Sequence, residues 1–308
     1  MSEKFEVNDV CDVNYIIKYV GIGLTTILLF AFCFLVSFKK HIHDMFHSVR
    51  VHVCITWCLG LFLNIATDIH TVREDPHINL IIGTIMIYFY TSSMTWVCCE
   101  AHAIFKALTA GIISGRSKIY KPFGYGTPFL IIGSYSVLVA VLPIFSLKLQ
   151  LMIFLQKLGT LFVTSADDLG TDPRCFISWD DMPKQIYLWY MDGLGLIAII
   201  FGIIICFNIA RPQTKRKNVV ADLVSQARGS ALACFAFPFF WFFAALTYLR
   251  NPESDTPDMY CYFLIVIGFF GVIIFIIYGL LSKRFRQGMK GPKSRYAIQE
   301  DAPSTVSR

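Results

Sequence analysis

The sequence predicts an all-α integral membrane protein in which seven transmembrane helices form a bundle, with the N-terminus outside. Three observations support this prediction. Hydrophobic residues make up 56% of the 308 residues, charged residues 16%, and the mean hydropathy is +0.59, whereas soluble domains carry about 25% charge. The apolar residues gather in blocks of roughly twenty, the length of helix that crosses the hydrocarbon core. Basic residues collect between alternate blocks, as the positive-inside rule requires.

Each apolar block is expected to form one helix, because a backbone in lipid must satisfy its own hydrogen bonds. The seven expected spans cover residues 15–38, 49–69, 78–108, 123–146, 186–210, 229–249 and 259–281. A further apolar stretch, residues 147–163, is interrupted by lysines and glutamines. It is interpreted as an interfacial helix or an outward extension of the fourth span, because an eighth span would place the basic loop 211–228 outside.

The loop charges set the orientation. With the amino end outside, the inner segments hold most of the 27 Lys and Arg residues, beginning with Lys39, Lys40 and Arg50, and the outer segments are acidic. Residues 1–14 then form a short extracellular tail, residues 15–281 the bundle and residues 282–308 a cytoplasmic tail. That tail opens with Lys283-Arg284-Phe285-Arg286, a pattern typical of a short amphipathic helix on the inner leaflet.

Two ionisable residues lie inside expected spans, where each costs about 2.5–3.5 kcal/mol on insertion scales. His52 lies near the cytosolic end of the second span, and Glu100 in the inner half of the third. A hydrogen bond between them would satisfy both groups and tie the two helices together. The functional interpretation is an inner polar switch that opens when the bundle rearranges. The structural alternatives are a static interhelical bond, or a histidine that meets the lipid headgroups.

Three further residues are candidates for function. Asp68 and Asp192 lie at the outer ends of spans two and five, where they line an expected outer cavity and meet a cationic ligand group, or are simply wetted at the interface. Pro238 lies in the middle of span six, where proline removes a backbone donor and kinks a helix. Such a kink is interpreted as a hinge, although prolines that do not move are also common in membrane helices.

The ten cysteines divide by location. Seven fall inside spans, where they are expected to pack as small apolar groups. Cys11, Cys175 and Cys261 lie at the outer side, where disulfides persist. The sequence predicts a bridge from Cys175 to Cys11 or Cys261 and does not choose between them.

Motifs of catalysis are absent from the sequence: it contains no P-loop, no dinucleotide-binding glycine pattern, no His-Glu-x-x-His and no Gly-x-Ser-x-Gly. We therefore predict that the protein is not an enzyme and uses no cofactor or metal ion. The net charge of +6 is distributed as the membrane topology requires, so no nucleic-acid partner is predicted.

Four segments in order resemble the seven-helix domain of adhesion and secretin-like G-protein-coupled receptors. They are Val51-His52-Val53, the run Tyr88 to Glu100 with its Ser-Met-Thr-Trp-Val-Cys-Cys-Glu ending, Gly124-Tyr125-Gly126-Thr127-Pro128, and Cys175-Phe176-Ile177-Ser178. Amoebal cyclic-AMP-type receptors share the last two. The chain departs from the family pattern where the third-span cysteine would fall near Asn79, and where a seventh-span Gln-Gly reads Phe270-Gly271. Only about fourteen residues precede the first span, so no hormone-binding ectodomain is expected.

The resemblance implies a plasma-membrane receptor that passes a signal from an unknown extracellular ligand to a heterotrimeric G protein. It implies that His52 and Glu100 belong to an inner polar network that loosens on activation. The G protein would meet the basic inner loops, through Arg116, Lys118, Lys121, Lys215, Arg216 and Lys217. The alternatives are a receptor-like adaptor that does not signal and a small multi-pass transporter.

Overall fold

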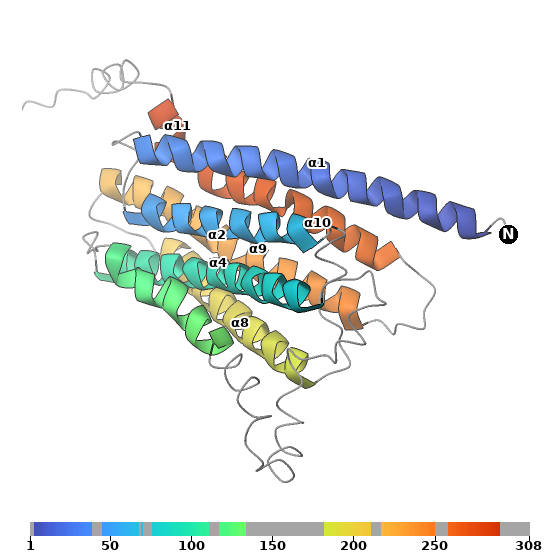
Figure 1. The fold of residues 1–308 in the computed structure, drawn as a ribbon. Coiled ribbons are helices and arrows are strands. Elements are labelled where there is room, and N and C mark those ends of the chain that lie inside the picture. The colour runs from blue at the N-terminus through green and yellow to red at the C-terminus, as the bar shows by residue number, and fades with distance from the viewer. Residues whose placement is uncertain are drawn as a thin grey trace, which may run out of the picture.

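The computed structural model describes residues 3–38, 45–67, 69, 76–110, 117–133, 182–210, 217–249 and 258–289. These residues are almost entirely helical, and no strand occurs among them. Six long helices run side by side in one bundle (Figure 1): α1 (Glu3–Phe38), α2 (Met45–Thr67), α4 (Pro76–Ala110), α8 (Met182–Ala210), α9 (Lys217–Leu249) and α10 (Asp258–Phe275). The fourth span opens with η1 (Ser117–Tyr120) and η2 (Pro122–Gly126). The π-helix η3 (Ile276–Leu280) continues α10, and α11 (Lys283–Met289) follows it.

Each expected span contains a described helical segment, which agrees with the predicted helix bundle. Four of the described helices contain stretches long and apolar enough to cross a membrane, namely Ile16–Phe38, Met45–Thr67, Ile81–Thr109 and Met191–Ala210; a shorter apolar stretch is Ile265–Leu280. The predicted helix after the last span is α11. The second half of the fourth span and the stretch 147–163 lie outside the described residues.

Two helices extend beyond the spans expected from hydropathy. Helix α1 begins at Glu3 rather than at Tyr15, so most of the predicted tail 1–14 is helical. No glycine or proline precedes Gly21, so nothing breaks the helix where it leaves the expected span. Helix α9 begins at Lys217, well before residue 229. Hydropathy locates the part of a helix that lies in lipid, and not where the helix itself ends.

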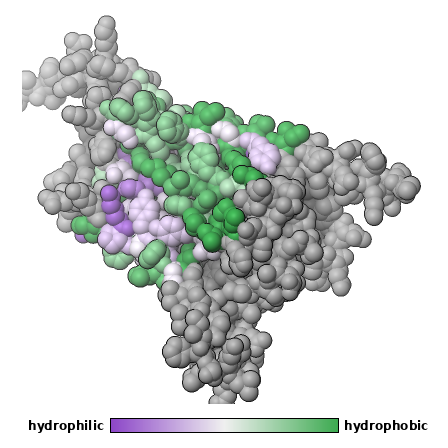
Figure 2. Space-filling model, in the orientation of Figure 1, coloured by the Kyte–Doolittle hydropathy of each residue, from purple (hydrophilic) through white to green (hydrophobic). Residues whose placement is uncertain are grey.

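Helix α4 is the centre of the bundle. It packs against α2, α8, α9 and η2, and the whole run from Thr91 to Val97 is buried. Large apolar side chains on the outer helices face away from the bundle, for example Ile27 (68% exposed) and Phe30 (70% exposed) of α1. Figure 2 shows hydrophobic side chains across the middle of one face and hydrophilic ones toward the end where α2 begins. An apolar band of this kind is what a lipid-facing surface requires.

Small residues bring α1 and α10 together. The Thr25 hydroxyl donates a 2.7 Å hydrogen bond to the carbonyl of Gly268. A Cβ atom on Gly271 would collide with Cγ2 of Thr25 and lie 3.2 Å from Cδ1 of Leu29. Close contact between small residues drives helix association in membranes, where the hydrophobic effect between helices is missing.

Replacing Gly271 with alanine is therefore expected to destabilise the bundle by about 1–3 kcal/mol, the usual cost of overpacking. Gly23→Ala on α1 is the matched control, because nothing lies within 4 Å of the Cβ it would add. The thermal midpoint of each purified variant in detergent measures the effect. Equal midpoints for the two variants would show that α1 is not held against α10 at this position.

Candidate functional site

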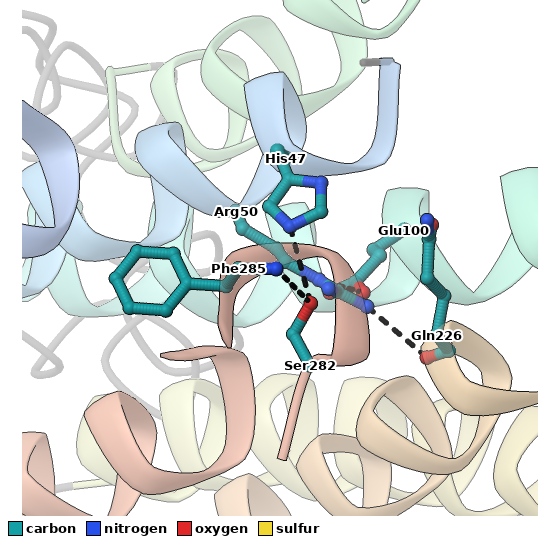
Figure 3. A network of polar contacts seen from close by, with 6 residues as sticks. All are labelled: His47, Arg50, Glu100, Gln226, Ser282 and Phe285. Atoms are coloured by element: carbon teal, nitrogen blue, oxygen red, sulfur yellow. Dashed lines mark hydrogen bonds and ion pairs between the residues drawn. The ribbon is translucent and has the colours of Figure 1, made fainter. Parts of the chain in front are cut away.

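A buried ion pair lies at the end of the bundle that the loop charges place in the cytosol. The Nε atom of Arg50 on α2 donates to Oε1 of Glu100 on α4 over 2.7 Å. The side chains are 1% and 0% exposed. Charge-assisted hydrogen bonds of this length are the strong kind. The pair fixes α2 against α4 near their cytosolic ends (Figure 3).

The Arg50 guanidinium also reaches the last two helices of the bundle. Its Nη2 atom donates a 3.1 Å hydrogen bond to the backbone carbonyl of Gln226 on α9. Its Cζ atom lies 5.0 Å from the ring centroid of Tyr278 in η3, within range of a cation–π contact. Gly229 lets α9 lie close to η3, because a Cβ there would lie 3.3 Å from the carbonyl oxygen of Ile277. One side chain therefore contacts α4, α9 and η3.

The same cluster extends to α11. A 3.3 Å hydrogen bond joins Nε2 of His47 on α2 to Oγ of Ser282, and that oxygen accepts the backbone N–H of Phe285 over 3.4 Å. Ser282 thus caps the start of α11, where the first backbone donors lack helical partners. The Phe285 ring is buried and lies 5.3 Å from the ring of Phe32 on α1. Figure 3 shows these side chains converging from α2, α4, α9 and the segment that leads into α11. We call His47, Arg50, Glu100, Gln226, Tyr278 and Ser282 the inner cluster.

The contacts of the inner cluster form only when the helices that carry them are correctly positioned. Burying two charges carries a desolvation penalty, which their attraction offsets only when the geometry is good and further hydrogen bonds are made. Arg50 meets that condition only while α4, α9 and η3 stay in place. A π-helical turn such as η3, which carries Tyr278, is a frequent feature of functional sites. An outward movement of α9 would remove one of these partners and weaken the others.

The expected hydrogen bond between His52 and Glu100 is not formed. His52 faces the fourth span instead: its Nδ1 atom lies 2.9 Å from the hydroxyl of Tyr125, and its ring stacks on Trp96 with centroids 4.4 Å apart. Arg50 takes the place against Glu100 that was expected for His52. Two positions along a helix turn a side chain by about 200°, so Arg50 and His52 point to nearly opposite sides of α2.

Three of the four segments that carried the resemblance meet in space around His52. The Ser92 hydroxyl donates a 2.8 Å hydrogen bond to the carbonyl of Gly124. A Cβ on Gly124 would collide with the indole ring of Trp96, and the Tyr125 ring packs edge-on against that indole at 5.2 Å. The glycine is needed because the backbone of the fourth span lies directly on Trp96. This contact joins α2, α4 and η2 and lies apart from the inner cluster.

Pro238 lies inside α9, beside a layer of aromatic rings. The Trp57 ring of α2 is 5.6 Å from Phe237, 5.2 Å from Phe240 and 4.8 Å from Phe270 of α10. The proline leaves one backbone carbonyl of α9 without its helical donor. Phe237 and Phe240, on either side of the proline, hold α9 against α2 and α10. A hinge at Pro238 remains a proposal.

The other predicted site residues are described only in part. Asp192 is exposed on α8 and lines a groove between α8 and α9. Asp68 and Cys175 lie outside the described residues, and the side chains of Cys11 and Cys261 are not described, so the disulfide stays a prediction.

Lys121 is exposed between η1 and η2. Lys118 lies in η1 and Lys217 opens α9, whereas Arg116, Lys215 and Arg216 lie outside the described ranges. Within those ranges, no group of three His, Cys, Asp or Glu side chains is placed to hold a metal ion.

Sequence reasoning missed Arg50, because it was counted among the basic residues of an inner loop. A signal was present in the helical period. Arg50, Cys54, Trp57 and Leu61 follow the i, i+4, i+7, i+11 spacing of one helix face, and all four are buried. An arginine on the same face as a tryptophan in an apolar helix predicts a buried cation that needs an anion on a neighbouring span.

Comparison with known proteins agrees with this architecture. The family of 7 transmembrane receptors (Secretin family) matches residues 12–274. Adhesion G protein-coupled receptor E2 of Canis lupus familiaris is 25% identical over 288 residues, which cover 88% of this chain and 30% of that protein. Adhesion G protein-coupled receptor E2 of Homo sapiens is 25% identical over 301 residues, 92% of this chain and 32% of that protein.

The chain therefore spans about a third of the length of these relatives. The match covers most of the chain and includes the three segments that meet around His52. It confirms the resemblance that the motifs indicated and the seven-transmembrane fold that hydropathy predicted. The chain belongs to the secretin family of seven-transmembrane receptors.

Proposed function

We propose that the chain is a plasma-membrane receptor that transmits an extracellular signal to a heterotrimeric G protein. The observation that carries this proposal is the buried Arg50–Glu100 pair at the cytosolic end. It supports a switch because one cation contacts α4, α9 and η3 together. The family membership supports a receptor. The basic inner loops, in which Lys121 is exposed, support an anionic cytosolic partner surface.

In the resting state, the inner cluster holds α9 close to α2 and α4. A ligand that favours the rearranged bundle shifts the population toward the state in which these contacts are broken. Movement about Pro238 would separate the Gln226 carbonyl from the Arg50 guanidinium and uncover the cytosolic ends of α4 and α9. The G protein then binds the opened end. His52 has a different role in this scheme, since its hydrogen bond to Tyr125 holds the fourth span against α2 and it is not part of the inner cluster.

The test measures G-protein activation without ligand in cells that express wild type, Glu100→Gln or Arg50→Gln, divided by the amount of receptor at the surface. Both variants are expected to raise basal activation by about fivefold or more, the lower range of allosteric coupling. His102→Gln is the matched control on α4, because His102 is exposed and its ring nitrogen lies 3.3 Å from the Tyr120 hydroxyl, away from the cluster.

Silence of all variants at equal surface level, across every G-protein class, would contradict the proposal. The chain would then be a receptor-like adaptor that does not signal. Equal activation by His102→Gln and Glu100→Gln would show instead that any disturbance of α4 activates the receptor, and that the inner cluster is not the switch.

A further inference from the structure

A groove opens on the lipid-facing side of the bundle between α8 and α9, and Ile273 of α10 and Ile277 of η3 complete its lining. Its volume is about 830 Å³, within the range of sites that bind drug-sized ligands. Its floor is the close contact of the two helices, where a Cβ on Gly195 would lie 3.3 Å from Cβ of Pro238. Leu196 and Phe239 form its rim, and they are 59% and 69% exposed. The groove therefore opens toward hydrocarbon.

One charged residue lines this otherwise apolar groove. Asp192 lies at its outer end, while the remaining lining is aliphatic or aromatic apart from Gly195 and Pro238. Asp192 forms no ion pair with any residue of the described ranges, where the ion pair found is Arg50–Glu100. A carboxylate facing lipid is unfavourable unless a counter-charge reaches it. The apolar side chains that line the groove lower the local dielectric constant around the carboxylate, which strengthens its attraction for a cation.

We propose that this groove binds a single-chain lipophilic amine from the outer leaflet. The ammonium group would pair with the Asp192 carboxylate, and the hydrocarbon chain would lie along Leu196 and Phe239 across Pro238. The charge of Asp192 favours a cationic headgroup on the ligand. The apolar walls and the side open to lipid favour a hydrocarbon tail that enters the groove from the bilayer. The site differs from the outer cavity that the sequence predicted for Asp192, because it faces the membrane. It does not depend on G-protein coupling.

The position of the groove gives the amine a route to affect the receptor. Pro238 forms part of the floor, and Phe239 is next to it on α9. A chain that fills the groove contacts α9 at the residue where the helix lacks a hydrogen bond. It would favour whichever arrangement of α8 and α9 keeps the groove open. The same molecule would have no differential effect if both states presented the same groove.

The test uses the full chain in lipid nanodiscs and three photoreactive probes that share one alkyl chain: a primary amine, an alcohol and a carboxylic acid. Crosslinks to α8 and α9 are quantified by mass spectrometry. The amine is expected to label the groove about tenfold more than the alcohol, as a charge-assisted hydrogen bond allows. Asp192→Asn should remove this preference while labelling by the alcohol stays unchanged. The isosteric amide leaves the packing intact, and the elution profile of the purified variant checks its fold.

Two further variants locate the binding. Leu196→Trp fills the groove and should abolish labelling by all probes. Ile197→Trp is the control, because Ile197 is 46% exposed on the same helix and is not part of the lining. Equal labelling by amine and alcohol, unaffected by Asp192→Asn, would overturn the proposal and show that the groove holds ordinary lipid. Crosslinks between two copies of the chain through α8 and α9 would overturn it as well, because a second copy would then cover the groove.

Discussion

Arg50→Met is expected to destabilise the protein by about 3–5 kcal/mol, the largest effect of any single substitution considered for this chain. The methionine fills much of the arginine volume but leaves the Glu100 carboxylate buried, 0% exposed, without its cation. The double variant Arg50→Met, Glu100→Leu removes both charges, and apolar replacement of a buried pair is often neutral or stabilising. It should therefore recover most of the lost stability.

Thermal unfolding of the purified variants in detergent measures both steps of this cycle. Lys106→Met is the control for the loss of a basic residue, because Lys106 lies on α4 and is exposed. If Arg50→Met lowers the midpoint no more than Lys106→Met does, the ion pair contributes nothing to the fold. If the double variant is as unstable as the single one, the cost comes from lost packing and not from an unpaired charge.

The double variant also separates stability from switching. A stable bundle without the ion pair lacks the contacts that depend on α9 and η3 being in place. Its ligand-free activation should therefore stay high although its fold is restored. A switch made of general packing would behave differently, because activation and instability would then rise and fall together.

Hydropathy and loop charge predicted the fold because both depend on local sequence. An apolar block of the right length must become a helix in lipid, whatever surrounds it. The helix ends were harder to predict, since residues 3–14 of α1 mix acidic and apolar side chains and form no apolar block that hydropathy would detect. The amphipathic start of α11 was visible because Phe285 stands between basic residues, and it is Phe285 that is buried.

The site was predicted only in part, because contacts between spans depend on rotation about each helix axis. Glu100 was identified from its cost in lipid, which is a property of one residue. Its partner was assigned to His52 rather than Arg50, two positions away and so on nearly the opposite side of the helix. Choosing between them requires the face of α2 that meets α4. The buried side chains of Trp57 and Leu61 mark that face of α2. The charge pattern alone does not show which residues of the helix are buried.

The contact between the fourth span and α4 also depends on an arrangement that no local pattern reveals. The motif Gly124-Tyr125-Gly126 is recognisable in sequence, but its two glycines look alike. In the structure they differ sharply. Gly124 lies against the Trp96 indole, whereas nothing lies within 4 Å of the Cβ that Gly126 would carry.

Gly124→Ala is therefore expected to destabilise the protein by about 1–3 kcal/mol through overpacking, with about 1 kcal/mol more if the Ser92 hydrogen bond to its carbonyl is lost. The Trp96 ring has little freedom to move away, because His52 stacks on it and Tyr125 packs against its edge. The fourth span must shift instead. Gly126→Ala should leave the unfolding midpoint within the error of the measurement.

A second substitution tests the cause. Trp96→Leu removes the ring that the new methyl group meets, so Gly124→Ala should cost less in that background than in wild type. Such a difference is a direct interaction energy between the two positions. If the two effects simply add, the alanine acts through the local backbone of η2. The fourth span would then be held in place by the His52–Tyr125 hydrogen bond rather than by close contact of Gly124 with the indole.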